Sequence, residues 1–219
     1  MTKEEALAEV AKRIAACEQC KYVPNQNPVP GEGNPDAEIM FVGEAPGAKE
    51  NETGRPFVGA AGKFLAEMLN SIGLEREDVF IANAIKYQPP GNRDPLPEEI
   101  ALQLPFLKKQ IAIINPKLIC FLGRHAMHAL LPNNAKPISV LHGQLILVLR
   151  KQTAISYQQS AKTESLADSR EPRAESPAQA YLPLYHPAAA LYNGSMRQIL
   201  LEDFAKIPGY MDQITAEKN

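Results

Sequence analysis

Two glutamates stand in a segment where the chain must turn sharply several times. Glu44 and Glu50 belong to GEAPGAKENETGRPFVGAAGKFL, residues 43–65, which holds five glycines. Glycine lets a backbone turn tightly and approach a ligand closely. The segment is not a Walker phosphate loop, because Lys63 is followed by Phe64. A site for a small planar ligand is favoured, with a glycine-rich connection carrying solvated glutamates as the alternative.

Two further polar side chains lie in or directly after apolar runs. His186 follows YLPLY, where an imidazole could donate to a developing anion or transfer a proton. Asn83 lies within VFIANAI, and its amide donor and acceptor match the polar edge of a pyrimidine. The alternative readings are a hydrogen-bonded histidine that ends a strand and a buried asparagine satisfied by nearby backbone.

These residues need elements to position them, and the apolar pattern supplies alternating strands and helices. Short apolar runs typical of strands buried on both faces occupy 37–43, 79–85, 118–123, 145–150 and 181–186. Helical patterns occupy 2–17, 60–72, 97–114, 124–131 and 196–207. This alternation predicts an α/β fold, a three-layer α/β/α sandwich with a mainly parallel sheet of four to five strands. Its ligands should bind beyond the carboxyl ends of the strands.

Composition indicates one globular domain spanning residues 1–219. The hydrophobic fraction is 45%, the charged fraction is 22% and the formal net charge is -2, which excludes a disordered or collagen-like chain. No apolar run reaches the roughly 20 residues of a membrane span, and the first residues lack the apolar stretch of a signal peptide. We therefore expect a cytoplasmic monomer that does not bind membranes.

One segment interrupts the pattern. Residues 151–180 are rich in Ser, Gln, Ala, Lys and Glu and contain few large apolar side chains. A segment of this composition offers little to a core, so we expect a flexible insertion.

Several motifs in one order resemble a known family. GEAPG, GRPFVGAAGKFL, the NxxK and PPGNRDPLPEE stretch and HPAAALY resemble the family 4 uracil-DNA glycosylases. The resemblance covers about residues 1–150 and 181–207. It implies an α/β fold, uracil-containing DNA as the partner, and monofunctional excision of uracil that starts base excision repair.

The resemblance also implies a role for each candidate residue. Glu44 and the backbone of Ala45 would line the uracil pocket, and Glu50 would help hold the attacking water. Phe57 would stack on the flipped base and Asn83 would read its polar edge.

The remaining roles concern the leaving base and the DNA. His186 would stabilise the departing uracil anion. Leu191 would be the wedge that fills the vacated position in the duplex. Tyr192 stands where the family usually has an arginine, and with Arg197 it is assigned to the DNA contact.

The cysteines depart from the family. Its members usually hold an iron-sulfur cluster with four cysteines, of which Cys17 and Cys20 would be a remnant, whereas Tyr87 and Gln103 occupy the other two positions. Neither is a comparable soft ligand, so the sequence predicts no [4Fe-4S] cluster. Cys120 is expected to be a buried apolar residue.

Zinc is the other metal considered. His125 and His128 complete a formal Cys2His2 count with the cysteine pair, but their spacing is shorter than usual. Surface or packing histidines are therefore favoured over a zinc site, and no cofactor is expected.

Two alternatives to uracil excision stay open from the sequence. One is a glycosylase for another deaminated base, such as hypoxanthine or xanthine. The other is a catalytically inactive protein that binds DNA lesions. Retention of Glu44, Glu50, Asn83 and His186 argues against the second.

Overall fold

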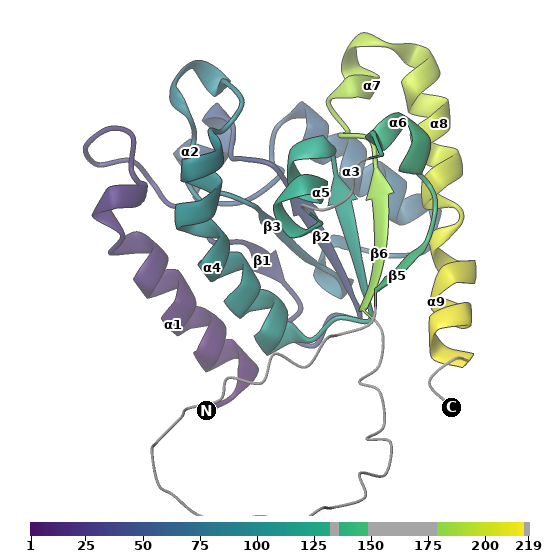
Figure 1. The fold of residues 1–219 in the computed structure, drawn as a ribbon, viewed down its shortest axis with the longest axis horizontal. Helices are drawn as coiled ribbons and strands as arrows, with labels where there is room; N and C mark the ends of the chain where they lie inside the picture. The colour runs from purple at the N-terminus through teal and green to yellow at the C-terminus, as the bar shows by residue number, and fades with distance from the viewer. Residues whose placement is uncertain (132–135, 149–178, 217–219) are drawn as a thin grey trace, which may run out of the picture.

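The computed structural model describes residues 1–131, 136–148 and 179–216, and its centre is a six-stranded sheet (Figure 1). The strands are β1 (Glu32–Gly33), β2 (Ile39–Gly43), β3 (Phe80–Asn83), β4 (Leu118–Leu122), β5 (Ile146–Val148) and β6 (Gln179–Leu184). Their order across the sheet is β1-β3-β2-β4-β6-β5. The four inner strands are parallel, and β1 and β5 pair antiparallel at the two edges.

Helices cover both faces of this sheet. They are α1 (Lys3–Ala15), α2 (Ala48–Thr53), α3 (Ala60–Ser71), α4 (Pro97–Ile114), α5 (Arg124–Leu130), α6 (Ile138–Leu141), α7 (Ala189–Tyr192), α8 (Gly194–Phe204) and α9 (Ile207–Ala216). Three short 3-10 helices, η1 (Glu18–Cys20), η2 (Arg76–Asp78) and η3 (Pro90–Asn92), lie in the connections. The predicted α/β sandwich is confirmed.

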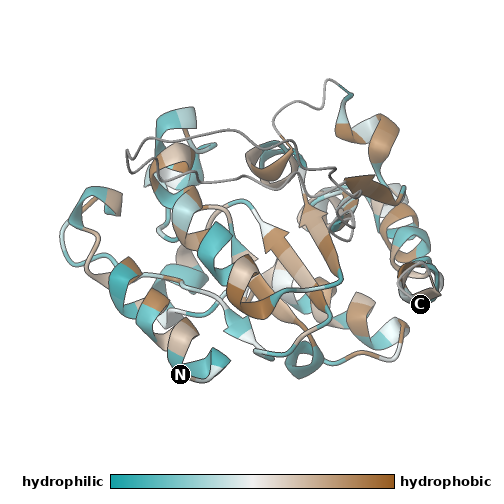
Figure 2. Cartoon of the chain, turned by 60° about the horizontal axis from the view of Figure 1, so that its bottom comes forward, coloured by the Kyte–Doolittle hydropathy of each residue, from teal (hydrophilic) through white to brown (hydrophobic). Residues whose placement is uncertain are grey.

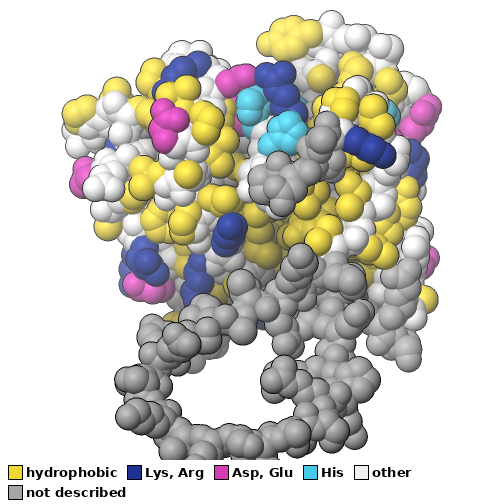
Figure 3. Space-filling view, in the orientation of Figure 1, with side chains coloured by type: hydrophobic (Ala, Val, Ile, Leu, Met, Phe, Trp, Pro, Cys, Tyr) yellow, Lys and Arg dark blue, Asp and Glu magenta, His cyan; other side chains and the backbone are white. Residues whose placement is uncertain are grey.

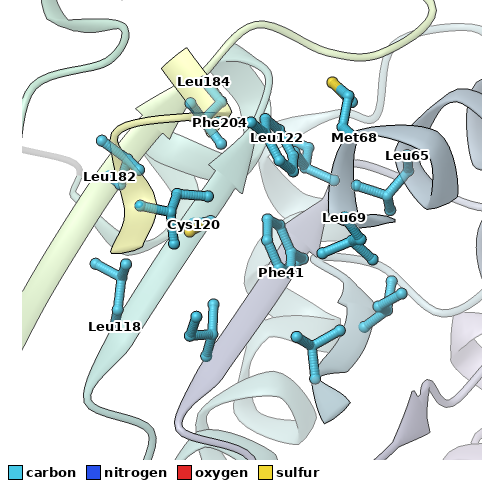
Figure 4. Close-up of a cluster of buried hydrophobic side chains, with 14 of the residues drawn as sticks. Phe41, Leu65, Met68, Leu69, Leu118, Cys120, Leu122, Leu182, Leu184 and Phe204 are labelled. Atoms are coloured by element: carbon cyan, nitrogen blue, oxygen red, sulfur yellow. The ribbon is translucent and has the colours of Figure 1, made fainter. Parts of the chain in front are cut away.

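The parallel strands are buried on both faces because their side chains alternate between two apolar clusters. In β2, Phe41 enters the cluster that faces α3, α8 and α9, whereas Met40 and Val42 enter the cluster that faces α4 and α5. Figure 4 shows the first cluster, in which Cys120 packs among leucines and Phe41 lies below α3. Figure 2 shows the same pattern, with apolar strands at the centre and helices that are polar on one side.

The structure corrects two details of the predicted sheet and helices. The sheet has six strands rather than four to five, because two residues of the Pro- and Gly-rich stretch after the cysteine pair form β1 against β3. The predicted helix 196–207 is α8, which ends at Phe204, and a further helix that the sequence did not predict, α9, begins at Ile207.

The predicted insertion can be compared with the structure only at its end. Gln179 and Ala180 belong to β6 and pair with Val148 and Leu147 of β5, so they are not part of an insertion. Residues 151–178 of the predicted segment lie outside the described residues.

The first helix packs on α4 at one side of the molecule, as Figure 1 shows. Val10, Ile14, Cys20 and Tyr87 form a third, smaller apolar cluster there. We call residues 3–20, together with Tyr87 that packs against them, the N-terminal lobe. Among the described residues, no helix has both the length and the apolarity needed to cross a bilayer.

Candidate active site

A pocket of about 450 Å³ opens where β2, β3 and β6 end. This is the edge of the sheet at which the sequence predicted a ligand site. All six residues expected in the pocket line it, together with eight others; the lining is Glu44, Ala45, Pro46, Gly47, Glu50, Phe57, Ala61, Asn83, Pro89, Asn92, Arg93, His186, Ala188 and Tyr192.

Glu50 organises the glycine-rich connection between β2 and α3. Its Oε2 accepts the amide of Gly47 at 3.1 Å, and its Oε1 accepts the amides of Val58 and Gly59 at 2.8 and 2.9 Å. The carboxylate therefore joins the start of α2 to the start of α3. A carboxylate offers about four acceptor positions, so one on Oε2 remains for a further donor.

Phe57 presents its ring to the pocket from a left-handed backbone conformation, with φ of 51°. Few residues other than glycine adopt this conformation, and neighbours must hold it. Arg76 does so by donating to the carbonyl oxygens of Pro56 and Phe57 at 2.8 and 3.0 Å, while Glu32 binds Arg76. A Cβ on Gly62 would lie 1.8 Å from the Phe57 carbonyl oxygen, so only glycine fits there.

Asn83 ends β3 and is buried, with 1% of its surface exposed. Its Oδ1 has no hydrogen-bond partner among the described residues, although a buried amide oxygen is nearly always paired. Gly43 lies beside it on β2, and a Cβ there would come within 2.4 Å of this oxygen and 2.5 Å of the Phe57 ring. The lack of a side chain at Gly43 thus lets the Asn83 amide and the Phe57 ring both pack closely against the end of β2.

His186 follows β6 on the other side of the pocket, and its ring centre lies 5.7 Å from that of Phe57. The Ala188 amide donates to its Nδ1 at 3.1 Å, so a neutral ring carries its proton on Nε2. Burial lowers the pKa of His186 to about 4, although Glu50 acts in the opposite direction. At neutral pH the pocket therefore holds an uncharged imidazole that can donate from Nε2.

Glu44 directly follows β2. Burial raises the pKa of its carboxyl group, although nearby His125 acts in the opposite direction. His125 Nε2 lies 3.9 Å from Glu44 Oε2 and 3.1 Å from Asp94 Oδ2, and Arg124 binds the same Asp94 oxygen at 2.7 Å. Figure 3 shows acidic, basic and histidine side chains together at this upper end of the molecule.

Three of these side chains lie close enough together to hold a cation. One ligand atom each of Glu44, Asp94 and His125 lies within 4.8 Å of the others. Asp94 is already bound to Arg124 and His125, so the arrangement works as an ion-pair network without a metal.

The pocket rim contains residues that the sequence analysis did not assign. Pro89, Asn92 and Arg93 belong to the PPGNRDPLPEE stretch, and Arg93 forms a two-bond ion pair with Glu99. The signal was present, because this stretch is one of the motifs that carry the family resemblance. It was not assigned to the pocket because it begins several residues after β3, and only the fold brings η3 to the pocket.

The three residues assigned to DNA do not share one environment. Tyr192 is 91% exposed and lines the pocket mouth, whereas Leu191 beside it is 45% exposed and does not line it. Arg197, on α8, pairs with Glu67 and lies over the Phe64 ring at 4.4 Å. Arg197 is therefore held on the surface of α3 rather than at the pocket.

The N-terminal lobe does not fit the ligand set of a four-thiolate cluster. Cys17 and Cys20 form a disulfide. Tyr87 is fully buried beside Cys20 and donates its hydroxyl to the Ile14 carbonyl at 2.8 Å, while Gln103 accepts the Lys86 amide at 2.6 Å. Hydrogen-bonded side chains thus fill the two departing positions, and the absence of a cluster stays a prediction.

The zinc alternative also lacks support from the arrangement. The cysteine pair packs with α1 and Tyr87, whereas His125 lies beside Glu44 and His128 is exposed on the same helix. The four residues of the formal zinc count therefore belong to two different places.

Together the pocket residues can bind a flat ring with a polar edge. Phe57 supplies an aromatic face, Asn83 an edge-reading amide, and His186 a neutral donor for a developing negative charge. Glu50 and Glu44 supply carboxyl groups for a water or for a developing positive charge.

Comparisons with known proteins agree with this chemistry. The model of the Uracil DNA glycosylase superfamily matches residues 30–207. A type-4 uracil-DNA glycosylase of Sulfurisphaera tokodaii is 44% identical over 205 residues, which cover 93% of this chain and 84% of the relative. Type-4 enzymes of Saccharolobus solfataricus and Archaeoglobus fulgidus are each 41% identical, over 90% and 93% of this chain and 83% and 92% of the relatives.

Proposed function

The chain belongs to the uracil DNA glycosylase superfamily, and we propose that it excises uracil from DNA by hydrolysing the bond between the base and its deoxyribose, the first step of base excision repair. Relatives that match nearly the whole chain carry this activity in their names. The observation that carries the assignment to this pocket is the buried, unsatisfied Asn83 Oδ1 opposite the Phe57 ring.

Asn83 distinguishes uracil from cytosine by the direction of its hydrogen bonds. Uracil presents an N3–H donor next to the O4 acceptor, so Oδ1 accepts the former and Nδ2 donates to the latter. Cytosine presents an acceptor at N3 and an amino donor at C4, which repel an amide held in this orientation. The base reaches the pocket only after it is flipped out of the DNA.

His186 stabilises the leaving group. When the C1′–N1 bond breaks, its electron pair moves onto the uracil ring, and the negative charge appears partly at O2. The neutral Nε2–H of His186 donates to that oxygen, because Nδ1 is occupied by the Ala188 amide. A fixed donor aimed at charge that forms in the transition state accelerates the step.

Glu50 holds the attacking water. Three of its acceptor positions take backbone amides, and the remaining one on Oε2 accepts a water O–H. The water oxygen then bonds to C1′ of the oxocarbenium-like sugar, and the water proton passes to the Glu50 carboxylate that holds it. Glu44 lies at the same pocket wall, where a carboxylate stabilises the positive sugar.

Leu191 and Tyr192 face the DNA from α7. We assign Leu191 to the position that the flipped base leaves in the duplex, and Tyr192 to a contact with DNA at the pocket mouth. Arg197 is assigned to the DNA backbone beyond α8. A cytoplasmic monomer without a cofactor stays our prediction for the working form.

The direct test is incubation of the purified protein with oligonucleotides that contain uracil, hypoxanthine or xanthine, followed by alkaline cleavage at abasic sites. We expect cleavage at uracil. Cleavage only at hypoxanthine or xanthine would support the alternative substrate class, and no cleavage together with tight lesion binding would support an inactive binding protein.

A second test addresses base reading. Asn83→Asp replaces the amide donor by a carboxylate oxygen, so excision of uracil should fall and cytosine should gain relative to it. Equal selectivity in the parent and variant would show that another group reads the base.

A further inference from the structure

The end of β3 carries a carbonyl group for which the neighbouring strand has no donor. β1 and β3 pair antiparallel, with Glu32 opposite Ile81, and the Asn34 amide donates to the Val79 carbonyl at 3.0 Å. Bonds in such a ladder recur at every second residue, so the next donor in this register would be the amide of Pro30, two residues before β1 begins. Proline has no amide hydrogen, and the Asn83 carbonyl cannot be paired by the backbone of that residue.

Lys86 supplies the missing donor from three residues further along the chain. Its Nζ donates to the Asn83 carbonyl at 2.8 Å, to Gln110 Oε1 at 2.8 Å, and more weakly to the Pro30 carbonyl at 3.4 Å. Gln110 also donates to Pro30, at 2.7 Å. When charged, the ammonium has three hydrogens for these three acceptors, and it joins β3, the segment before β1, and α4.

The rest of the turn is fixed at the same place. The Lys86 amide donates to Gln103 on α4. The amides of Ala84 and Ile85 donate to the carbonyls of Gly43, which ends β2, and of Glu44, which follows it. The turn that presents Asn83 is thus tied on one side to the strand end that carries Glu44. On its other side it is tied to α4 through Lys86.

This lysine is a costly way to fill a buried position. Lys86 has no exposed surface, and its three acceptors are uncharged oxygens. Burial without a charged partner lowers its pKa to about 7. An apolar side chain would avoid the desolvation cost, so the position needs an explanation other than core packing.

We propose that Lys86 is a positioning residue for base recognition, which fixes the Asn83 amide by holding the Asn83 backbone in place of the amide that Pro30 lacks. This inference rests on the proposed role of Asn83 in reading uracil. Lys86 does not line the pocket, so it acts only through the turn 83–86. Its removal should therefore damage only what Asn83 contributes.

The test is a double-mutant cycle on single-turnover excision of uracil from DNA. Lys86→Met keeps the apolar stem and removes the donors, and we expect a loss of about 10- to 100-fold, typical of a mispositioned group. Because Lys86 acts through Asn83, the double variant Lys86→Met/Asn83→Ala should be no slower than Asn83→Ala alone. A loss under threefold, or losses that multiply in the double variant, would overturn the proposal.

Lys206→Met is the matched control. Lys206 also donates to a buried acceptor, Asp203 Oδ1 on α8, but neither residue lines the pocket. It should lower the melting temperature and leave excision within about twofold, since distant sites act independently. If Lys86→Met does not fold, Gln110→Leu, which removes one acceptor of the ammonium, is judged by the same cycle with Asn83→Ala.

Amide hydrogen exchange separates failure of this inference from failure of the proposed function. Exchange in residues 83–87 should quicken in Lys86→Met relative to Lys206→Met, whether or not uracil is cleaved. If exchange is faster in Lys86→Met but the parent protein does not excise uracil, only the proposed function is wrong. If exchange is unchanged in Lys86→Met, the positioning role is wrong even when the parent is active.

Discussion

The pocket and the N-terminal lobe both bury polar atoms, but the two regions differ in whether those atoms have hydrogen-bond partners. In the pocket, Asn83 Oδ1 has no partner among the described residues and Phe57 holds a left-handed backbone. In the lobe, the Tyr87 hydroxyl binds the Ile14 carbonyl inside an apolar cluster. Unsatisfied groups and strain reduce stability and persist where a ligand uses them. Substitutions in the pocket should therefore affect excision, and substitutions in the lobe should affect stability.

The largest effect on the pocket side is expected from His186→Ala. It removes the donor to the departing base, so single-turnover excision should fall about 100- to 1,000-fold, as for other donors to a developing anion. Far-UV circular dichroism should be unchanged. His128→Ala, at an exposed histidine of α5, is the control and should retain full activity. Excision by His186→Ala within a few-fold of the parent would remove the histidine from the mechanism.

Gly43→Ala tests the placement of the two groups that are proposed to bind the base. The added Cβ would lie 2.4 Å from Asn83 Oδ1 and 2.5 Å from the Phe57 ring, so it would push the amide or the ring out of place. We expect about a 100-fold loss of excision, since shifts near 1 Å have effects of that size. Gly209→Ala on α9 has no neighbour within 4 Å of the new Cβ and serves as the control. Equal activities of the two variants would show that the pocket binds something else.

The pocket should also make stability depend on pH through His186. Its folded pKa, about 4, lies below the ordinary value of 6.5, so between these values the unfolded imidazole binds a proton that the folded one does not. Stability should therefore fall as pH decreases from 6.5 to 4, by up to about 3 kcal/mol.

Urea unfolding at several pH values measures this contribution as the difference between the parent and His186→Ala. Glu44, whose pKa is raised, contributes with the opposite sign in both proteins and cancels in the difference. Parallel curves for the two proteins would mean that His186 is not held neutral by the fold.

On the lobe side, Tyr87→Phe removes one buried hydroxyl and leaves the ring. The Cys17 amide also donates to the Ile14 carbonyl, so the loss of unfolding free energy should be only about 1 kcal/mol. Excision should change by less than about twofold, because Tyr87 does not line the pocket and the variant keeps the buried ring in place. Tyr192→Phe, at a 91% exposed tyrosine, is the control for stability. A large loss of activity in Tyr87→Phe would show that the two regions are coupled.

The sequence was sufficient for features that depend on local pattern. The helix 97–114 appears as α4 with the predicted bounds, since Pro97 and two glutamates mark its start. The strands β2 and β4 are buried at every residue, as their continuous apolar runs predicted. Thr2 and Glu5 form a capping box at the start of α1, a pattern that lies within four consecutive residues.

The tertiary structure decided how the pocket residues face one another. Phe57 takes its left-handed conformation because Arg76, 19 residues later, holds its carbonyl and Gly62 leaves room for it. The Ala188 amide donates to Nδ1 of His186 and so leaves the proton of the neutral ring on Nε2. The strand β1 forms by pairing with β3, which lies far from it in the sequence. Residue types and spacing along the chain indicate which groups can react. Their orientation depends on contacts between distant segments, which no local pattern encodes.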